Sequence, residues 1–270
     1  MSQFVYLIKN FFTHKDFLPP ANELPGTLFT PLHFIFASII LASVIALAFI
    51  LAKKSERSIK KVFTVIWCLS IVLEAAKILW ETYCGRVVSF ETGGVLPLYP
   101  CSIFMYAMPL VIWGNGILKR AGCGYLCTLG ILGGAINFVY PANILSSYSC
   151  ISFAGFHTLF FHGAILFCAL TVLISKYHTY TSITKWYYLF VPAIPCLTVS
   201  LIANAVNFSK IGSDYMFFKL NSFFLAPIGA VLPDAATVAI VYAVYILIHA
   251  LPYIPSFIAN KAKNTKKEAL

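Results

Sequence analysis

The feature that most constrains this chain is a series of long apolar runs separated by short basic segments. Of its 270 residues, 60% are hydrophobic and only 10% are charged. A soluble domain has about 45–50% apolar and about 25% charged residues, so the composition excludes a water-soluble globular protein. Intrinsic disorder is excluded too, because it requires low hydrophobicity and high net charge.

Seven of these runs approach or exceed the ~20 residues that a helix needs to cross a bilayer. The expected spans are residues 32–52, 62–82, 97–113, 121–140, 156–175, 186–206 and 231–251. We therefore expect an all-α fold, a polytopic membrane helix bundle of about seven transmembrane helices. Its expected divisions are an N-terminal outer or interfacial segment (1–30), a single transmembrane helical domain (31–255) and a basic cytoplasmic tail (256–270).

The distribution of basic residues predicts the direction of the bundle. Thirteen of the 19 lysines and arginines lie on one side of the expected spans, in the connector 53–61, at 119–120, at 176 and 185, and in the tail. Cytoplasmic loops carry such an excess, so we expect the C-terminus in the cytoplasm and the N-terminus outside. The same scatter between spans argues against nucleic acid as the partner of this +10 chain, and membrane lipids are the expected partners.

Few polar residues lie within the spans, and ionisable groups there are costly and face the protein interior. Glu74, Lys77 and Glu81 share one stripe of the second expected helix, since they are three and four residues apart. One interpretation is a self-neutralising ladder that packs inward. The other is that Glu81 orients a catalytic group or a substrate head group.

Cys101 follows two prolines at the start of the third expected span, in the sequence LPLYPCS. Prolines there leave backbone carbonyls unpaired, which a membrane protein tolerates only beside protein or a wet cavity. We therefore expect Cys101 at the lip of an outward-facing cavity, ~6 Å below the outer helix end. The alternative is a small packing residue, because most of the eight cysteines lie in apolar runs.

The fifth expected span carries His157 and His162, five residues apart. This spacing points the two rings ~140° away from each other, so a shared metal site is not expected, and no CxxC pair offers another. No cofactor is expected either. His162 would lie near the depth of Cys101, or would make an interhelical hydrogen bond. His157 is expected to be a solvated cap or a substrate contact.

Other polar residues are expected at the outer level of the bundle, where they would contact or support a substrate: Asn204, Asp214 and Tyr215. One outer polar cavity differs from the midplane sites and paired broken helices of many transporters. Within it, a Cys and a His at equal depth could form a thiolate–imidazolium pair that attacks a carbonyl carbon. The ester of a lipid acyl chain is the carbonyl that such a cavity would meet.

Three motifs resemble a known family: LPLYPCSIF (96–104), FFHGAILF (160–167) and SDYMFF (213–218). Their order and spacing resemble the YwaF family of integral membrane proteins, which includes the mammalian acyltransferase called transmembrane protein 164. The resemblance implies a thiol-dependent enzyme that moves fatty acyl groups between phospholipids, with Cys101 as nucleophile and His162 as base. It also implies a bacterial cell membrane as the location. Pro100 and Tyr99 depart from the family pattern beside the cysteine.

Two functions thus remain open from the sequence. The first is a Cys/His-dependent lipid acyltransferase, or a related lipid ester hydrolase. The second is a non-enzymatic binding or transport protein whose outer-leaflet cavity holds a small amphiphile.

The predicted direction can be tested with single cysteine reporters in intact cells. A reporter at Lys263 should be protected from membrane-impermeant thiol reagents, because the basic tail is expected in the cytoplasm, and a reporter at Ser2 should be labelled. Labelling of the tail alone would invert the predicted topology. A chain without either reporter is the control for the native cysteines.

Overall fold

The chain folds as an assembly of helices in this computed structural model, which describes residues 3–84, 96–175, 177–178, 194–206, 214–219, 226–251 and 254. Its α-helices are α1 (Gln3–Lys9), α2 (Pro31–Ala52), α3 (Glu56–Cys84), α4 (Phe104–Trp113), α5 (Gly116–Tyr125), α6 (Ile131–Val139), α7 (Ala142–Leu145), α8 (Phe153–Ile174), α9 (Ile194–Ala205), α10 (Ala226–Gly229) and α11 (Asp234–Ile248). Short 3₁₀ turns lie at Lys15–Phe17, Ala21–Glu23 and Tyr215–Phe217, and a π-helical turn at Leu126–Gly130 joins α5 to α6. No strand occurs among these residues, so the all-α prediction is confirmed.

Within the described residues, four helical stretches are long and apolar enough to cross a membrane: Pro31–Ala52, Glu56–Cys84, Gly116–Leu145 and Phe153–Ile174. They coincide with four of the expected spans. Three shorter apolar helices, α4, α9 and α11, lie where the other three spans were expected. The chain thus has the helices of an integral membrane protein, while the count of seven spans and their direction stay predictions.

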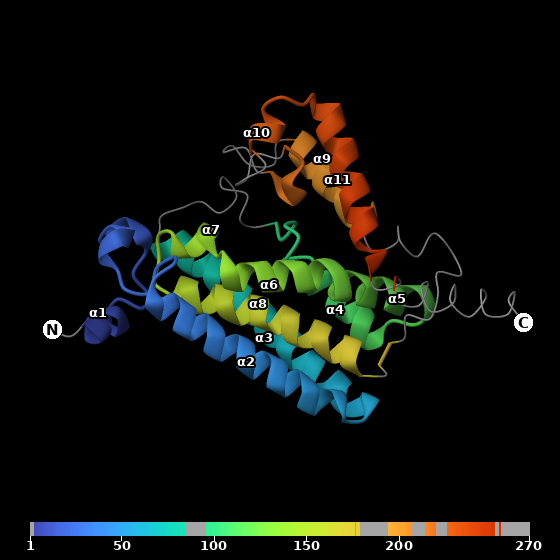
Figure 1. Cartoon of the computed structure of the whole chain (residues 1–270), viewed down its shortest axis with the longest axis horizontal. Coiled ribbons are helices and arrows are strands. Elements are labelled where there is room, and N and C mark those ends of the chain that lie inside the picture. Colours follow the sequence, from blue (N-terminus) through green and yellow to red (C-terminus); the bar gives the residue numbers. More distant parts are fainter. Residues whose placement is uncertain are drawn as a thin grey trace, which may run out of the picture.

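Helix α8 forms the centre of the bundle. Seventeen of its 22 residues are buried, against α2, α3 and α6. Figure 1 shows these four helices running side by side, with α9 and α11 set together at an angle to them. Ser152 caps the helix, because its Oγ accepts a hydrogen bond from Gly155 N. A buried helix of this kind is apolar all round, so its few polar side chains lie inside the protein.

The N-terminal segment folds onto one end of this bundle. Trp80 Nε1 donates to Phe12 O at 2.7 Å, and Phe153 N donates to Phe11 O at 2.8 Å. Lys15 N donates to the hydroxyl of Tyr148 at 3.2 Å. The backbone of this segment is therefore held against the end of the bundle by hydrogen bonds to Trp80 of α3, to Phe153 of α8 and to Tyr148.

The third expected span begins later than the sequence indicated. Helix α4 starts at Phe104, not near residue 97, because prolines at 97 and 100 interrupt the helical hydrogen bonds. The hydroxyl of Tyr125 donates to the irregular turn that precedes the helix, and lies 2.5 Å from Pro100 O and 3.3 Å from Cys101 O. Tyr125 is the last residue of α5, so the turn that carries Cys101 packs where α5 meets the π-helical turn.

A close contact between α4 and α5 requires glycine at position 122. A Cβ atom there would lie 2.8 Å from Ala107 O, closer than packed atoms allow. The two short helices therefore meet through their backbones. This contact holds α4, and the turn before it, against the centre of the bundle.

Pro109 interrupts α4 from within, and a tryptophan compensates. Proline has no N–H, so it cannot bond the carbonyl four residues earlier, which is that of Met105. Trp67 of α3 fills this place, since its indole Nε1 donates to Met105 O at 2.9 Å. The carbonyl is thus satisfied by another helix, as an apolar surrounding requires.

Trp67→Phe should lower the free energy of unfolding by about 1–3 kcal/mol, because Met105 O is left without a donor. In a Pro109→Ala background the cost should be much smaller, since the new N–H at position 109 can bond the same carbonyl. Thermal unfolding of the detergent-purified chain measures both effects. Trp113→Phe is the control, because the Trp113 indole makes no hydrogen bond to any described residue. Equal costs of Trp67→Phe in both backgrounds would refute the compensation.

Candidate functional site

Two charged residues of α3 and one histidine of α8 form a cluster inside the bundle. Glu74 Oε2 lies 3.0 Å from His157 Nε2, and Glu74 Oε1 lies 3.5 Å from Lys77 Nζ. All three side chains are largely buried, with exposed fractions of 13% for Glu74, 7% for His157 and 22% for Lys77. A charge is tolerated in such a place only when it is paired, and the Glu74 carboxylate pairs with both neighbours.

Part of the expected charged stripe is therefore present. Glu74 and Lys77 pair and face inward, as the ladder interpretation requires. Glu81 stays half-buried and contributes only a longer-range attraction to Lys77. His157 is not a solvated cap, because α3 packs against the first turns of α8 and covers the ring. The ring lies nearly parallel to that of Phe161, with centroids 5.8 Å apart.

Cys101 lies next to this cluster. Its side chain is half-buried, in the turn before α4. Phe104, three residues later, packs edge to face on Phe161, whose ring lies against that of His157. Tyr125, whose hydroxyl holds the carbonyl of Cys101, lies about 14 Å along the helix that starts at Gly116. The position of the thiol at the lip of an outer cavity stays a prediction.

His162 is the second histidine of α8 and is also buried. Its Nδ1 lies 2.8 Å from Thr158 O. A carbonyl oxygen only accepts, so Nδ1 carries the proton in this bond and Nε2 keeps its lone pair. Thr158 in turn donates from Oγ1 to Asn137 Oδ1 at 3.3 Å, which links α8 to α6.

Cys101 and His162 lie in one region of the core. The ring of Phe104, three residues after Cys101, meets that of Phe161, the residue before His162, with centroids 5.8 Å apart. Among the residues that the structure describes, no hydrogen bond joins the thiol to the imidazole. A general acid or base often reaches hydrogen-bond distance only once the substrate is bound.

The residues expected at the outer level hold a turn beside the cysteine. Asn204 of α9 donates from Nδ2 to Tyr215 O and accepts from Tyr215 N, both at 3.0 Å. The carboxylate of Asp214 accepts from Lys219 N at 2.8 Å. The Tyr215 ring is fully buried, with its centroid 5.3 Å from that of Tyr99. Asn204 and Asp214 thus fix the 214–219 turn, and Tyr215 of that turn packs against Tyr99 beside Cys101.

Two tyrosines near the thiol were not identified from the sequence. Tyr125 and Tyr245 are both buried, and the hydroxyl of Tyr125 lies 3.3 Å from Cys101 O. The signal was available, because a buried tyrosine usually finds a partner for its hydroxyl. Tyr245 donates to Met216 O at 3.3 Å, so it also fixes the 214–219 turn. Within the described parts of the chain, no three His, Cys, Asp or Glu side chains lie close enough together to hold a metal ion.

Glu74→Leu should lower the free energy of unfolding by about 3 kcal/mol, because it leaves Lys77 buried without its partner. Glu74→Leu with Lys77→Leu should recover part of this loss, since the unpaired charge is gone. Thermal unfolding in detergent measures both. Glu56→Gln, which breaks exposed pairs with Lys60 and Lys119, is the control and should cost under about 1 kcal/mol. If the single and double variants melt alike, the pairing does not stabilise the bundle.

The chain was also compared with known proteins. No curated protein and no solved structure gives a significant match. One family model does match, that of the TMEM164 family, over residues 28–260. The matched range contains all four helices able to cross a membrane, together with Glu74, Cys101, His157 and His162. This chain is therefore a member of the TMEM164 family.

Proposed function

We propose that this protein is a lipid acyltransferase that moves fatty acyl groups between phospholipids, with Cys101 as the nucleophile and His162 as the base. The observation that supports it best is the position of the Cys101 thiol. It lies in an irregular turn inside a helical membrane protein, and Phe104 next to that turn packs on Phe161, the neighbour of His162. Phe161 also stacks on His157, which contacts the carboxylate of Glu74.

The proposed first step transfers an acyl group to sulfur. His162 Nε2 takes the thiol proton, and Cys101 Sγ attacks the acyl ester carbonyl carbon of a donor phospholipid. The carbon–oxygen ester bond breaks, and the departing alkoxide takes the proton from His162. A lysophospholipid leaves, and a thioester remains on Cys101.

The second step reverses this chemistry on an acceptor. His162 Nε2 takes the proton of the acceptor lysophospholipid hydroxyl, whose oxygen attacks the thioester carbonyl carbon. The carbon–sulfur bond breaks, and the thiolate recovers the proton from His162. Water in place of the acceptor would give a free fatty acid, which is the related hydrolase activity.

Lys77 has a positioning role in this proposal. Glu74 pairs with its ammonium and also contacts His157, so these three side chains would hold α3 against the first turns of α8, the helix that carries His162. In the proposal, the proton of Cys101 is taken up and returned by His162.

The second candidate function is non-enzymatic binding or transport of a small amphiphile. The hydrogen bonds from His162 to Thr158 and from Thr158 to Asn137 favour it, because they equally suit a histidine that joins two helices. The reactivity of the thiol separates the two functions. An enzyme should show a Cys101 that reacts rapidly with acyl-like electrophiles, and a binding protein should not.

The test is acyl transfer by the purified full-length chain in vesicles that contain phosphatidylcholine and a labelled lysophospholipid. Cys101→Ala and His162→Ala should each abolish transfer, and the double variant should be no worse, because the two residues act as a unit. Cys101→Ser should retain little activity, since a hydroxyl is much harder to deprotonate than a thiol. Cys68→Ala is the matched control, because Cys68 is exposed on α3, and it should transfer at the wild-type rate.

The proposal fails if folded, membrane-inserted Cys101→Ala transfers acyl groups as the wild type does. It fails too if the wild type transfers none and its Cys101 reacts with electrophiles no faster than Cys68. The binding function would then be the better one. A thioester trapped on Cys101 by mass spectrometry would support the acyltransferase.

A further inference from the structure

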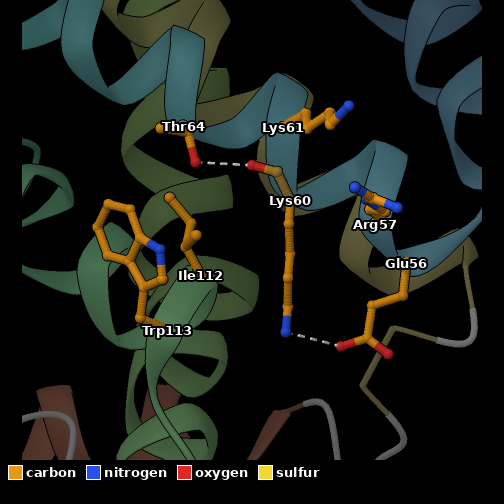
Figure 2. Close-up of a pocket in the computed structure, with 7 residues that line it drawn as sticks. All are labelled: Glu56, Arg57, Lys60, Lys61, Thr64, Ile112 and Trp113. Carbon is orange, nitrogen blue, oxygen red and sulfur yellow. Dashed lines mark hydrogen bonds and ion pairs between the residues drawn. The ribbon is translucent and has the colours of Figure 1, made fainter.

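A hollow of about 580 Å³ lies beside the first turns of α3, which precede Glu74 and Lys77 on the same helix. Glu56, Arg57, Lys60, Lys61, Thr64, Ile112 and Trp113 line it. Figure 2 shows the α3 side chains on one side of the hollow and the two apolar side chains of α4 on the other. The site therefore combines cations with an apolar wall.

The charges of this hollow do not cancel. Glu56 Oε1 lies 3.2 Å from Lys60 Nζ and 3.1 Å from Lys119 Nζ, so one carboxylate is shared by two ammonium groups. Arg57 and Lys61 are exposed, and neither pairs with a carboxylate within the part of the chain that the structure describes. Two cations are thus left to attract an anion.

The surroundings add to this positive potential. Lys119 also lies 4.1 Å from the centroid of the Tyr177 ring. Burial, together with the nearby Arg120 and Lys119, lowers the pKa of His178 to about 4. The protonated imidazole is disfavoured here because the basic groups of α5 already make this end positive.

The apolar wall indicates where the hollow lies relative to lipid. Trp113 is 56% exposed, and its ring meets that of Trp67 edge to face at 5.4 Å. Exposed tryptophans are enriched at the membrane–water interface. The hollow also adjoins the connector between α2 and α3, two helices able to cross the membrane. It therefore faces the layer in which phospholipid headgroups lie.

We propose that this hollow binds the phosphate headgroup of an anionic phospholipid from the surrounding bilayer. The guanidinium of Arg57 offers the planar pair of donors that matches phosphate oxygens, and Lys61 adds a second cation. The upper part of the lipid's acyl chains would lie along Ile112 and Trp113. A soluble phosphate would not use that apolar wall. The site does not depend on any chemistry at Cys101.

The experiment measures lipid binding to the full-length chain in detergent by native mass spectrometry, with phosphatidylglycerol and phosphatidylcholine as probes. Arg57→Gln with Lys61→Gln should weaken phosphatidylglycerol binding about twenty-five-fold, because each basic contact to an anionic lipid contributes about a factor of five and the two multiply. Lys53→Gln with Lys54→Gln is the matched control. It removes two charges from the same connector but none from the hollow, and should change binding little.

A second measurement uses phosphatidylglycerol with brominated chains, which should quench part of the tryptophan fluorescence in the wild type and less in Trp113→Phe. This readout does not require the charge variants to fold. Equal losses in the two double variants would show a general surface attraction and overturn the site. Equal binding of phosphatidylcholine, or displacement of phosphatidylglycerol by inorganic phosphate, would overturn the assignment to an anionic lipid.

Discussion

The structure depends on one constraint: inside a membrane, every backbone carbonyl needs a donor from the protein. Pro109 removes one such donor within α4, and helical bonding is also incomplete in the turn before α4 and near its end. Side chains of other elements donate at these places: Trp67 to Met105 O, Tyr125 to Pro100 O and Tyr177 to Val111 O at 2.8 Å. The Trp67 and Tyr177 bonds tie α4 to α3 and to the segment after α8, and the Tyr125 bond ties the turn before α4 to α5. The position of Cys101 follows, because the same Tyr125 hydroxyl also lies against its carbonyl.

The charged cluster obeys the same rule for side chains. Glu74 lies between Lys77 and His157, so a carboxylate that would be costly in isolation joins α3 to α8. A purely structural pair would leave its neighbours apolar. Here a half-buried thiol and a second histidine lie in the same region of the core, and this arrangement supports the proposed chemical role.

The sequence predicted the parts of the fold that depend on length and hydropathy. The helices Pro31–Ala52 and Phe153–Ile174 begin and end within a few residues of expectation, because apolar runs and N-caps determine them locally. The start of α4 was missed, because the irregular turn before it is held by the hydroxyl of Tyr125, a distant contact that the local sequence does not indicate. The burial of His157 was missed for a related reason. Periodicity places a residue on a face but does not say which helix covers that face.

The π-helical turn at Leu126–Gly130 has a consequence for how this family could vary. Each residue of an α-helix turns the chain by ~100°. The extra residue in the π-helical turn therefore determines which side chains of the following helix face the bundle. Helix α6 lies beyond it and carries Asn137, which reaches Thr158 and through it His162. A deletion of one residue in this turn would rotate Asn137 away from α8 while leaving the hydropathy of the segment almost unchanged. The length of this segment is therefore as much a determinant of the site as the identity of its residues.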